Sequence, residues 1–118
     1  PFAPVKYGDR TIVTGQGNNV FIFPGVGLGA IAVGAREVSG QMFTVAAETL
    51  AQLVSDKTLA QGTLFPRLSR LRELTRKIAE EVGKKACRDG LSDMDESAVP
   101  EAVKSLIWEP DYPRIIPG

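Results

Sequence analysis

Residues 15–36 read GQGNNVFIFPGVGLGAIAVGAR, and this stretch decides which fold we expect for the chain. Gly15 and Gly17 end a β-forming run, because glycine permits positive φ angles or a close backbone approach and so suits a tight loop that leaves a strand. The strand-like VFIF at residues 20–23 leads to Pro24, which is favoured in the first turn of a helix. The small residues that follow predict a tightly packed, buried helix. Each interior glycine costs such a helix about 1 kcal/mol relative to alanine, so tertiary burial must hold it.

The residues before this stretch predict two short strands. VKY at residues 5–7 and TIVT at residues 11–14 are rich in β-forming residues. They are separated by Gly8-Asp9-Arg10, a tripeptide that is typical of a turn. We therefore expect a hairpin or two short strands ahead of the glycine-rich loop.

The residues after it predict helices. Ser39 is a suitable N-cap for a first helix. Behind it, apolar residues recur at steps of three and four: Met42, Phe43, Ala46, Leu50, Leu53 and Val54. We expect Ser55 to end this helix and to cap a short turn over residues 56–60 that Gly62 closes.

A longer helix is predicted after Pro66. Its apolar stripe consists of Leu68, Leu71, Leu74, Ile78 and Val82. Ser69 is the candidate N-cap, and Gly90 after Arg88 and Asp89 is typical of the residue that follows a last helical turn.

The end of the chain predicts one more short helix and an irregular tail. After the polar linker SDMDES, VPEAVKSLIW is expected to form a helix from near Pro100. The tail EPDYPRIIPG cannot be regular because it contains three prolines. Large apolar or aromatic side chains lie in this tail and just before it, and each needs a surface of this chain or of a partner to pack on: Trp108, Tyr112, Ile115 and Ile116. The pattern alone predicts a mostly α-helical chain with a short β lead-in.

The charge balance argues against nucleic acid and membranes as partners. The 118 residues carry 14 basic and 14 acidic side chains, so the formal net charge is zero and no broad field attracts polyanions. A basic cluster runs from Arg67 to Arg88, but Glu73, Glu80 and Glu81 interrupt it at helical spacing, which favours a solvated helix face. No run of about 18 apolar residues and no signal-like start is present.

Cysteine usage and the first residue also limit the interpretation. Cys87 is the only cysteine and the chain has no histidine, so a disulfide framework is impossible, a reducing compartment is the simpler assumption, and Cys87 reads as an ordinary helix residue. The chain begins with Pro1 rather than Met, which is expected of a fragment, a processed chain or an excised domain.

One candidate site is GLGAIA at residues 27–32. It satisfies the G-x-G-x-x-A dinucleotide fingerprint, follows a strand-like run and opens a helix, so a pyrophosphate could bind at the N-terminus of that helix, where the glycines let the backbone approach it. However, Pro24 intervenes and no βαβ rhythm of further strands follows, as a Rossmann unit requires. Close helix packing is the alternative explanation of these glycines.

A second candidate site is the pair Asn18-Asn19. A carboxamide donates and accepts hydrogen bonds without adding charge, so it suits a carboxylate or hydroxyl substrate. The alternative is that these residues form an Asx turn that caps the next helix. Asp93, Asp95 and Glu96 are a third, acidic group, but they lie in the polar linker without ordered spacing, and nothing in the chain offers a general base near neutral pH.

Two motif blocks give the chain a family resemblance. GQGNNVFIFPGVGLGAIAVGAR at residues 15–36 and LAQGTLFPRLSRLRE at residues 59–73, with Met42-Phe43 between them, resemble the C-terminal part of malic enzymes of the large type. The blocks GQGNN-x-[YF]-I-F-P-G and L-A-Q-G-x-L-[YF]-P occur in the family's order. The resemblance covers essentially the whole chain, but only about the last fifth of such an enzyme.

The resemblance implies an activity and a set of site residues. Malic enzymes oxidise and decarboxylate L-malate to pyruvate and CO₂ with NAD or NADP and with Mg²⁺ or Mn²⁺. It implies that the acid, the base and the metal ligands lie outside this chain. Asn18 and Asn19 match the family's asparagine pair at the malate carboxylate, and the resemblance also places Asn18 and Gly17 near the nicotinamide. It implies that GLGAIA packs helices rather than holding pyrophosphate.

The resemblance also implies a division of the chain. Residues 1–19 are expected to end an α/β, Rossmann-like NAD(P)-binding domain, residues 20–90 to return to a central domain, and residues 91–118 to form a helix and an arm. The expected partners are the rest of the polypeptide and further copies in a dimer or tetramer, in the cytoplasm or alternatively the mitochondrial matrix. The 118-residue chain alone is expected to be inactive.

Two other classes of protein stay open on the sequence: a free-standing helical interaction module and a small nucleotide-binding domain. Calorimetric titration with NAD would separate the second, because a chain without a pyrophosphate site gives no heat. The mass of the intact source protein would separate the first.

Overall fold

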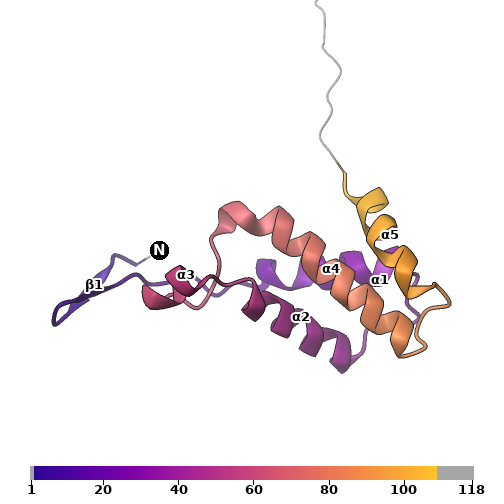
Figure 1. Ribbon diagram of the computed structural model, residues 1–118, viewed down its shortest axis with the longest axis horizontal. Helices are drawn as coiled ribbons and strands as arrows, with labels where there is room; N and C mark the ends of the chain where they lie inside the picture. Colours follow the sequence, from indigo (N-terminus) through magenta and orange to yellow (C-terminus); the bar gives the residue numbers. More distant parts are fainter. Residues whose placement is uncertain (1, 109–118) are drawn as a thin grey trace, which may run out of the picture.

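The computed structural model describes residues 2–108, so the expectations for Tyr112, Ile115 and Ile116 lie outside the described residues. These residues form a short hairpin followed by helices, as the sequence predicts (Figure 1). The strands are β1 (Val5–Tyr7) and β2 (Arg10–Ile12), and the α-helices are α1 (Phe23–Ala32), α2 (Gly40–Gln52), α3 (Asp56–Ala60), α4 (Leu71–Arg88) and α5 (Val99–Leu106). Three 3₁₀ turns precede helices: η1 (Asn19–Phe21), η2 (Leu68–Arg70) and η3 (Glu96–Ala98).

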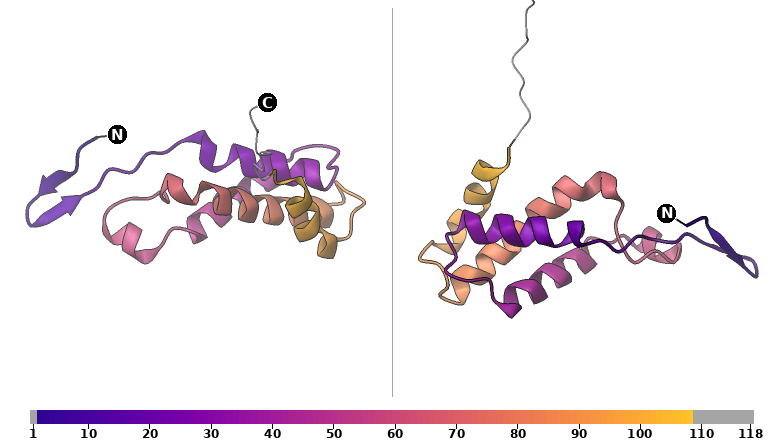
Figure 2. Two further views of the ribbon diagram at one scale, coloured as in Figure 1. Left: turned by 90° about the horizontal axis from the view of Figure 1, so that it is seen from above. Right: turned by 180° about the vertical axis from the view of Figure 1, so that it is seen from behind.

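The hairpin is confirmed, and it lies at one end of the molecule, away from the main group of helices (Figures 1 and 2). Its strands are antiparallel and pair Tyr7 with Arg10, so Gly8 and Asp9 form the two-residue turn. Gly8 has a φ of 57°, which the first position of a type II′ turn requires. Every residue of both strands is exposed, and a two-stranded ribbon of this kind is only marginally stable by itself.

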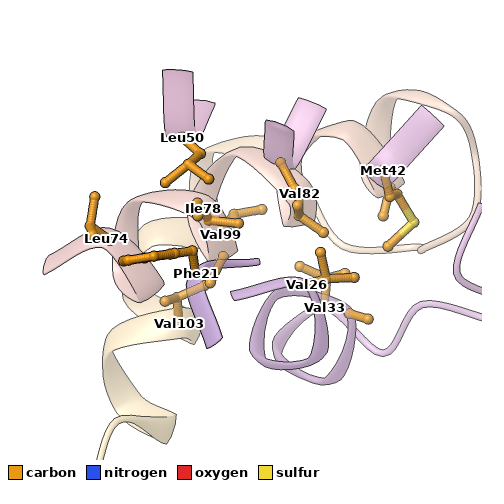
Figure 3. Packing of buried hydrophobic residues seen from close by; sticks show 14 residues of the cluster. Phe21, Val26, Val33, Met42, Leu50, Leu74, Ile78, Val82, Val99 and Val103 are labelled. Carbon is orange, nitrogen blue, oxygen red and sulfur yellow. The ribbon is translucent and has the colours of Figure 1, made fainter. Parts of the chain in front are cut away.

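The helices α1, α2, α4 and α5 enclose one hydrophobic core. Figure 3 shows Phe21, Val26, Ile78, Val82 and Val99 directed toward one another from η1, α1, α4 and α5. Helix α4 is central because α1, α2 and α5 all pack against it. The fully buried side chains of the core include Met42, Leu74, Ile78, Val82, Val99 and Val103.

Helix α1 owes its close packing to two of its glycines. A Cβ added to Gly29 would lie 2.6 Å from the carbonyl oxygen of Ala79 on α4, and one added to Gly25 would lie 2.6 Å from Cγ2 of Ile78. Gly27 has no such neighbour within 4 Å. The predicted helix packing is therefore confirmed for Gly25 and Gly29, which are one helical turn apart and face α4.

The strand-like interpretation of VFIF is wrong. Residues 19–21 form the 3₁₀ turn η1, and Phe23 already begins α1 with Pro24 in its first turn. The side chain of Asn18 accepts a hydrogen bond from the backbone N–H of Val20, which starts the turn. Four apolar residues do not distinguish a strand from a buried helical segment by periodicity, and this cap favours the helical form.

The predicted helix starts at Ser39 and Ser55 are confirmed. The Ser39 hydroxyl accepts from the N–H of Met42 at 3.3 Å, and the Ser39 N–H donates to the Met42 sulfur at 3.4 Å. Ser55 caps α3 by accepting from the N–H of Thr58. Methionine thus takes the place in this capping box that glutamate usually fills.

The predicted N-cap at Ser69 is wrong. Pro66 is followed by the 3₁₀ turn η2, so Ser69 lies inside a helical turn and α4 begins only at Leu71. An N-cap needs an extended backbone so that its oxygen can reach the free N–H groups ahead of it, and here Arg67 has that backbone.

Three helices end in the same way. Gly34, Gly62 and Gly90 all have positive φ angles and follow α1, α3 and α4. After α4, the N–H of Gly90 donates to the carbonyl of Cys87 and the N–H of Leu91 donates to that of Ala86, which is the Schellman pattern. The helix end predicted at Gly90 is confirmed.

The charges of η2 and α4 pair along the surface of these two consecutive helical segments. Arg70 binds Glu73 through two nitrogens, at 3.0 and 3.1 Å, and Arg76 binds the nearly buried Glu80 at 2.6 Å. Arg70 also donates to the carbonyl of Leu53 at 3.2 Å, near the end of α2. These short-range pairs support the predicted solvated helix face.

Candidate functional site

Two segments far apart in the sequence meet where the chain leaves the hairpin. The extended residues 13–17 lie against residues 61–65, and the N–H of Val13 donates to the carbonyl of Gln61 at 3.1 Å. The Thr63 hydroxyl donates to the carbonyl of Val13 at 2.6 Å. The GQGNN block and the LAQGTLFP block are therefore neighbours in space.

The glycines of GQGNN permit this close contact. A Cβ at Gly15 would lie 2.7 Å from Cγ2 of Thr63, and one at Gly17 would lie 3.1 Å from the ring of Phe65. Neither glycine has a positive φ angle. Of the two reasons for glycine that the sequence offered, close backbone approach is therefore the one that applies.

Phe65 joins this loop to the core. Its ring stacks on that of Phe21, with centroids 5.7 Å apart and an interplanar angle of 12°. Phe21 is almost fully buried in the helical core. The loop is thus supported by two stacked rings: Phe21 lies in the core, and Phe65 contacts Gly17.

The two asparagines follow this supported segment. Asn18 has an extended backbone, with φ −144° and ψ 142°, and its Oδ1 accepts from the N–H of Val20 at 3.0 Å. The carbonyls of Asn18 and Asn19 accept from the N–H groups of Phe21 and Ile22. The Asx-turn interpretation is therefore correct for Asn18.

This capping contact leaves a donor available. The cap uses Oδ1 of Asn18, whereas its Nδ2 group makes no hydrogen bond within residues 2–108, and the same holds for the whole carboxamide of Asn19. Both side chains are exposed. Capping and ligand binding by Asn18 are therefore compatible, because they use different atoms of one amide.

The asparagines line an open hollow whose other walls are apolar or glycine. Gly17, Asn18 and Asn19 form one side of it, and Ile22 and Phe65 complete it. None of these residues is charged, so the two amides are its polar side chains. Such a surface can orient a carboxylate through neutral donors. A second cavity, of about 260 Å³, has Gly15, Phe21 and Phe65 among its lining residues and has Phe65 in common with the hollow.

The other predicted candidates do not join this hollow. GLGAIA lies within α1 beyond its first turn, where helical hydrogen bonds use the backbone N–H groups, so it offers no N-terminal anion site. Asp93 pairs with Arg36 at 3.2 Å. Hydrogen bonds from the hydroxyl and the N–H of Ser97 hold the pKa of Asp95 below its ordinary value. Within residues 2–108, no group of three or more acidic or cysteine side chains could hold a metal ion.

Sequence reasoning from the residues missed Thr63 and Phe65. Phe65 precedes Pro66 in a stretch without regular secondary structure, so no periodicity marks it. The motif block that contains it was the only available signal. Among the helices of residues 2–108, none is both long and apolar enough to cross a membrane.

Comparison with known proteins identifies the family. A family model described as "Malic enzyme, NAD binding domain" matches residues 1–87. The NADP-dependent malic enzyme of Homo sapiens is 41% identical over 120 residues, which cover 99% of this chain and 21% of that protein. The mitochondrial NADP-dependent malic enzyme of Mus musculus is 45% identical over 115 residues, covering 95% and 19%. The mitochondrial NAD-dependent malic enzyme of Amaranthus hypochondriacus is 36% identical over 129 residues, covering 98% and 21%.

The chain belongs to the malic enzyme family, and most of it corresponds to part of the family's NAD-binding domain. The resemblance that the two motif blocks indicated is confirmed. The chain spans about a fifth of the length of the curated relatives it matches. Relatives that use NAD and relatives that use NADP are both among them.

Proposed function

We propose that this chain is part of an enzyme that oxidises and decarboxylates L-malate to pyruvate and CO₂ with NAD or NADP, and that Asn18 and Asn19 hold the substrate. The observation that carries the proposal is the amide of Asn18. Its oxygen is fixed by the cap on Val20, and its nitrogen remains a donor at an uncharged hollow.

The chemistry of the substrate fits such a site. Malate has two carboxylates, and only one of them leaves as CO₂. A neutral amide can bind the carboxylate that is retained without changing the charge balance of the site, so its role is to position the substrate. Since the cap holds Asn18 to Val20, the donor needs little reorganisation on binding.

The nicotinamide coenzyme accepts the hydride when it is bound, and in this proposal Asn18 and Gly17 lie near it. The dinucleotide phosphates, the acid, the base and a divalent metal ion such as Mg²⁺ or Mn²⁺ are expected to be held by residues outside this chain. No step of the reaction is assigned to the residues described here beyond orientation of the substrate.

The surface of the chain supports the idea that more polypeptide covers it. Helix α1 contains no polar side chain, yet its Phe23 is 56% exposed and its Ile31 is 72% exposed. Tyr7 of the hairpin is 77% exposed. We propose that residues 1–19 end the NAD(P)-binding domain and that residues 20–90 return to a central domain, a boundary that differs from that of the family model, which includes residues up to 87 in the NAD-binding domain. Residues 91–118 are proposed to contact other copies in a dimer or tetramer. Location in the cytoplasm or the mitochondrial matrix is part of the same proposal.

Steady-state kinetics of the full-length enzyme test the proposed function. The parent should form NADH or NADPH in a malate-dependent reaction. Asn18→Ala and Asn19→Ala should each lower kcat/KM for malate by about 10- to 100-fold, because a hydrogen bond to a charged group contributes about 1.5–3 kcal/mol. Thr44→Ala, on the exposed surface of α2, is the control and should leave the kinetics unchanged. Parental kinetics for both asparagine variants would remove the assigned role.

A further inference from the structure

We infer that Phe65 is a positioning residue for the substrate site, acting through the loop that carries Asn18 and Asn19. The inference rests on the proposed function of those asparagines. It concerns a side chain that the sequence patterns did not single out and that comes from a segment more than 40 residues further along the chain.

The first step of the argument is the place of the Phe65 ring. Phe65 lines the hollow together with Gly17, Asn18, Asn19 and Ile22, and it alone comes from the second motif block. It also lines the 260 Å³ cavity. The ring therefore belongs to the linings of both spaces and forms part of the wall of the hollow next to the asparagines.

The second step is the contact between this ring and the loop. A Cβ placed on Gly17 would lie 3.1 Å from Cε2 and 3.2 Å from Cζ of Phe65. Contacts of that length mean that the backbone of residue 17 lies directly on the ring. Asn18 follows immediately, so the ring limits how far the start of the asparagine pair can move inward.

The third step is the support of the ring itself. Phe65 stacks on Phe21, which is 2% exposed and belongs to the helical core. Phe21 is also the last residue of η1, the turn that Asn18 caps and Asn19 begins. The asparagine pair is thus held at both ends by the same aromatic stack, through Gly17 on one side and through η1 on the other.

This arrangement gives Phe65 a role in positioning the substrate. The ring adds no charge and no hydrogen-bond donor to the hollow, so it affects the substrate through the placement of the amides. A smaller aliphatic side chain would remove the ring that contacts Gly17, so the side-chain amides of Asn18 and Asn19 could move. A misplacement of about 1 Å can lower a reaction rate substantially.

The test uses the full-length enzyme and compares four single variants and one double variant. Phe65→Leu should raise KM for malate at least tenfold, with a smaller effect on KM for the coenzyme, and Phe65→Tyr should stay within about twofold of the parent. Phe43→Leu is the control, because Phe43 also contacts an aromatic ring, that of Phe23 at 6.0 Å, but does not line the hollow. It should leave KM for malate unchanged.

A fourth variant tests the contact itself. Gly17→Ala should raise KM for malate because its Cβ meets the ring, and combining it with Phe65→Leu should lower KM relative to Gly17→Ala alone. A Phe65→Leu enzyme with parental KM, or additive effects of the two changes, would overturn the inference. If the alanine variants of Asn18 and Asn19 also behave as the parent, the proposed function fails as well; if they raise KM, only the role of Phe65 fails.

Discussion

Because α1 and α4 pack closely, we predict opposite effects on stability for alanine substitutions at two glycines of α1. In Gly29→Ala, the added Cβ would lie 2.6 Å from the carbonyl oxygen and 3.1 Å from the Cα of Ala79. Both are backbone atoms, so no side-chain rotation can relieve the contact, and the two helices must separate. Gly27→Ala is the matched control in the same helix, because no atom lies within 4 Å of its added Cβ.

The expected free energies have opposite signs. Overpacking of a close interface costs about 1–3 kcal/mol, and the upper end applies here because backbone atoms must move. Replacement of glycine by alanine inside a helix stabilises the helix by about 1 kcal/mol. Gly29→Ala should therefore destabilise the fold by about 2 kcal/mol, whereas Gly27→Ala should stabilise it by about 0.5–1 kcal/mol.

Thermal unfolding of the 118-residue chain, followed by far-ultraviolet circular dichroism, measures this difference. The melting temperatures should differ by roughly 10 °C, since 1 kcal/mol corresponds to about 4 °C or more for a chain of this size. The same order should hold for thermal inactivation of the full-length enzyme. The reasoning is refuted if Gly29→Ala is as stable as Gly27→Ala in both assays.

Two further predictions concern the helix start at Ser39 and the ion pair on α4. Ser39→Ala should cost about 1 kcal/mol in urea unfolding because it removes the cap on Met42, whereas Ser69→Ala should have almost no effect, and equal losses would contradict the capping assignments. Hydrogen bonds from Arg70, followed by its charge, hold the pKa of Glu73 below its ordinary value. The stability from this pair is therefore present above the unfolded-state pKa and is lost as the pH falls through the folded-state pKa, so Glu73→Gln should flatten the acid side of a stability-against-pH curve. Both side chains are more than 40% exposed, so the effect should be small and should decrease further in high salt.

The helices were largely predictable because their ends carry local signals. Ser39 and Ser55 begin helices with their own side chains, and Gly90 ends one with a positive φ angle. Pro24 marks the first turn of α1. Each of these signals depends on residues within one turn, which the sequence alone contains.

The errors arose where neighbouring signals compete. VFIF could be a strand or a helical turn, and the cap from Asn18 decided for the turn. Ser69 had the right residue type for a cap, but Pro66 and the 3₁₀ turn after it placed Ser69 inside a helical segment. A residue type alone does not determine the backbone conformation that a cap requires.

The tertiary role of individual residues was out of reach of sequence patterns. Glycines recur at every second position from Gly25 to Gly29, and only the packed structure shows that Gly25 and Gly29 face α4 while Gly27 does not. The contact of Gly17 with Phe65 joins segments that no local signal relates. The sequence indicated the asparagine pair as a candidate site. Only the structure shows that Oδ1 of Asn18 caps the turn while its Nδ2 group is left as a donor.

The most direct test of the account is malate kinetics of Asn18→Asp in the full-length enzyme. Aspartate is as good an N-cap as asparagine, so η1 and the fold should be retained, but the Nδ2 donor is replaced by a charged oxygen that repels a carboxylate. The account predicts an unchanged melting temperature and a loss of at least 100-fold in kcat/KM for malate, since a lost charged hydrogen bond and a new repulsion together exceed about 2.7 kcal/mol. Parental kinetics in Asn18→Asp would show that Asn18 only caps the turn and would contradict the substrate site.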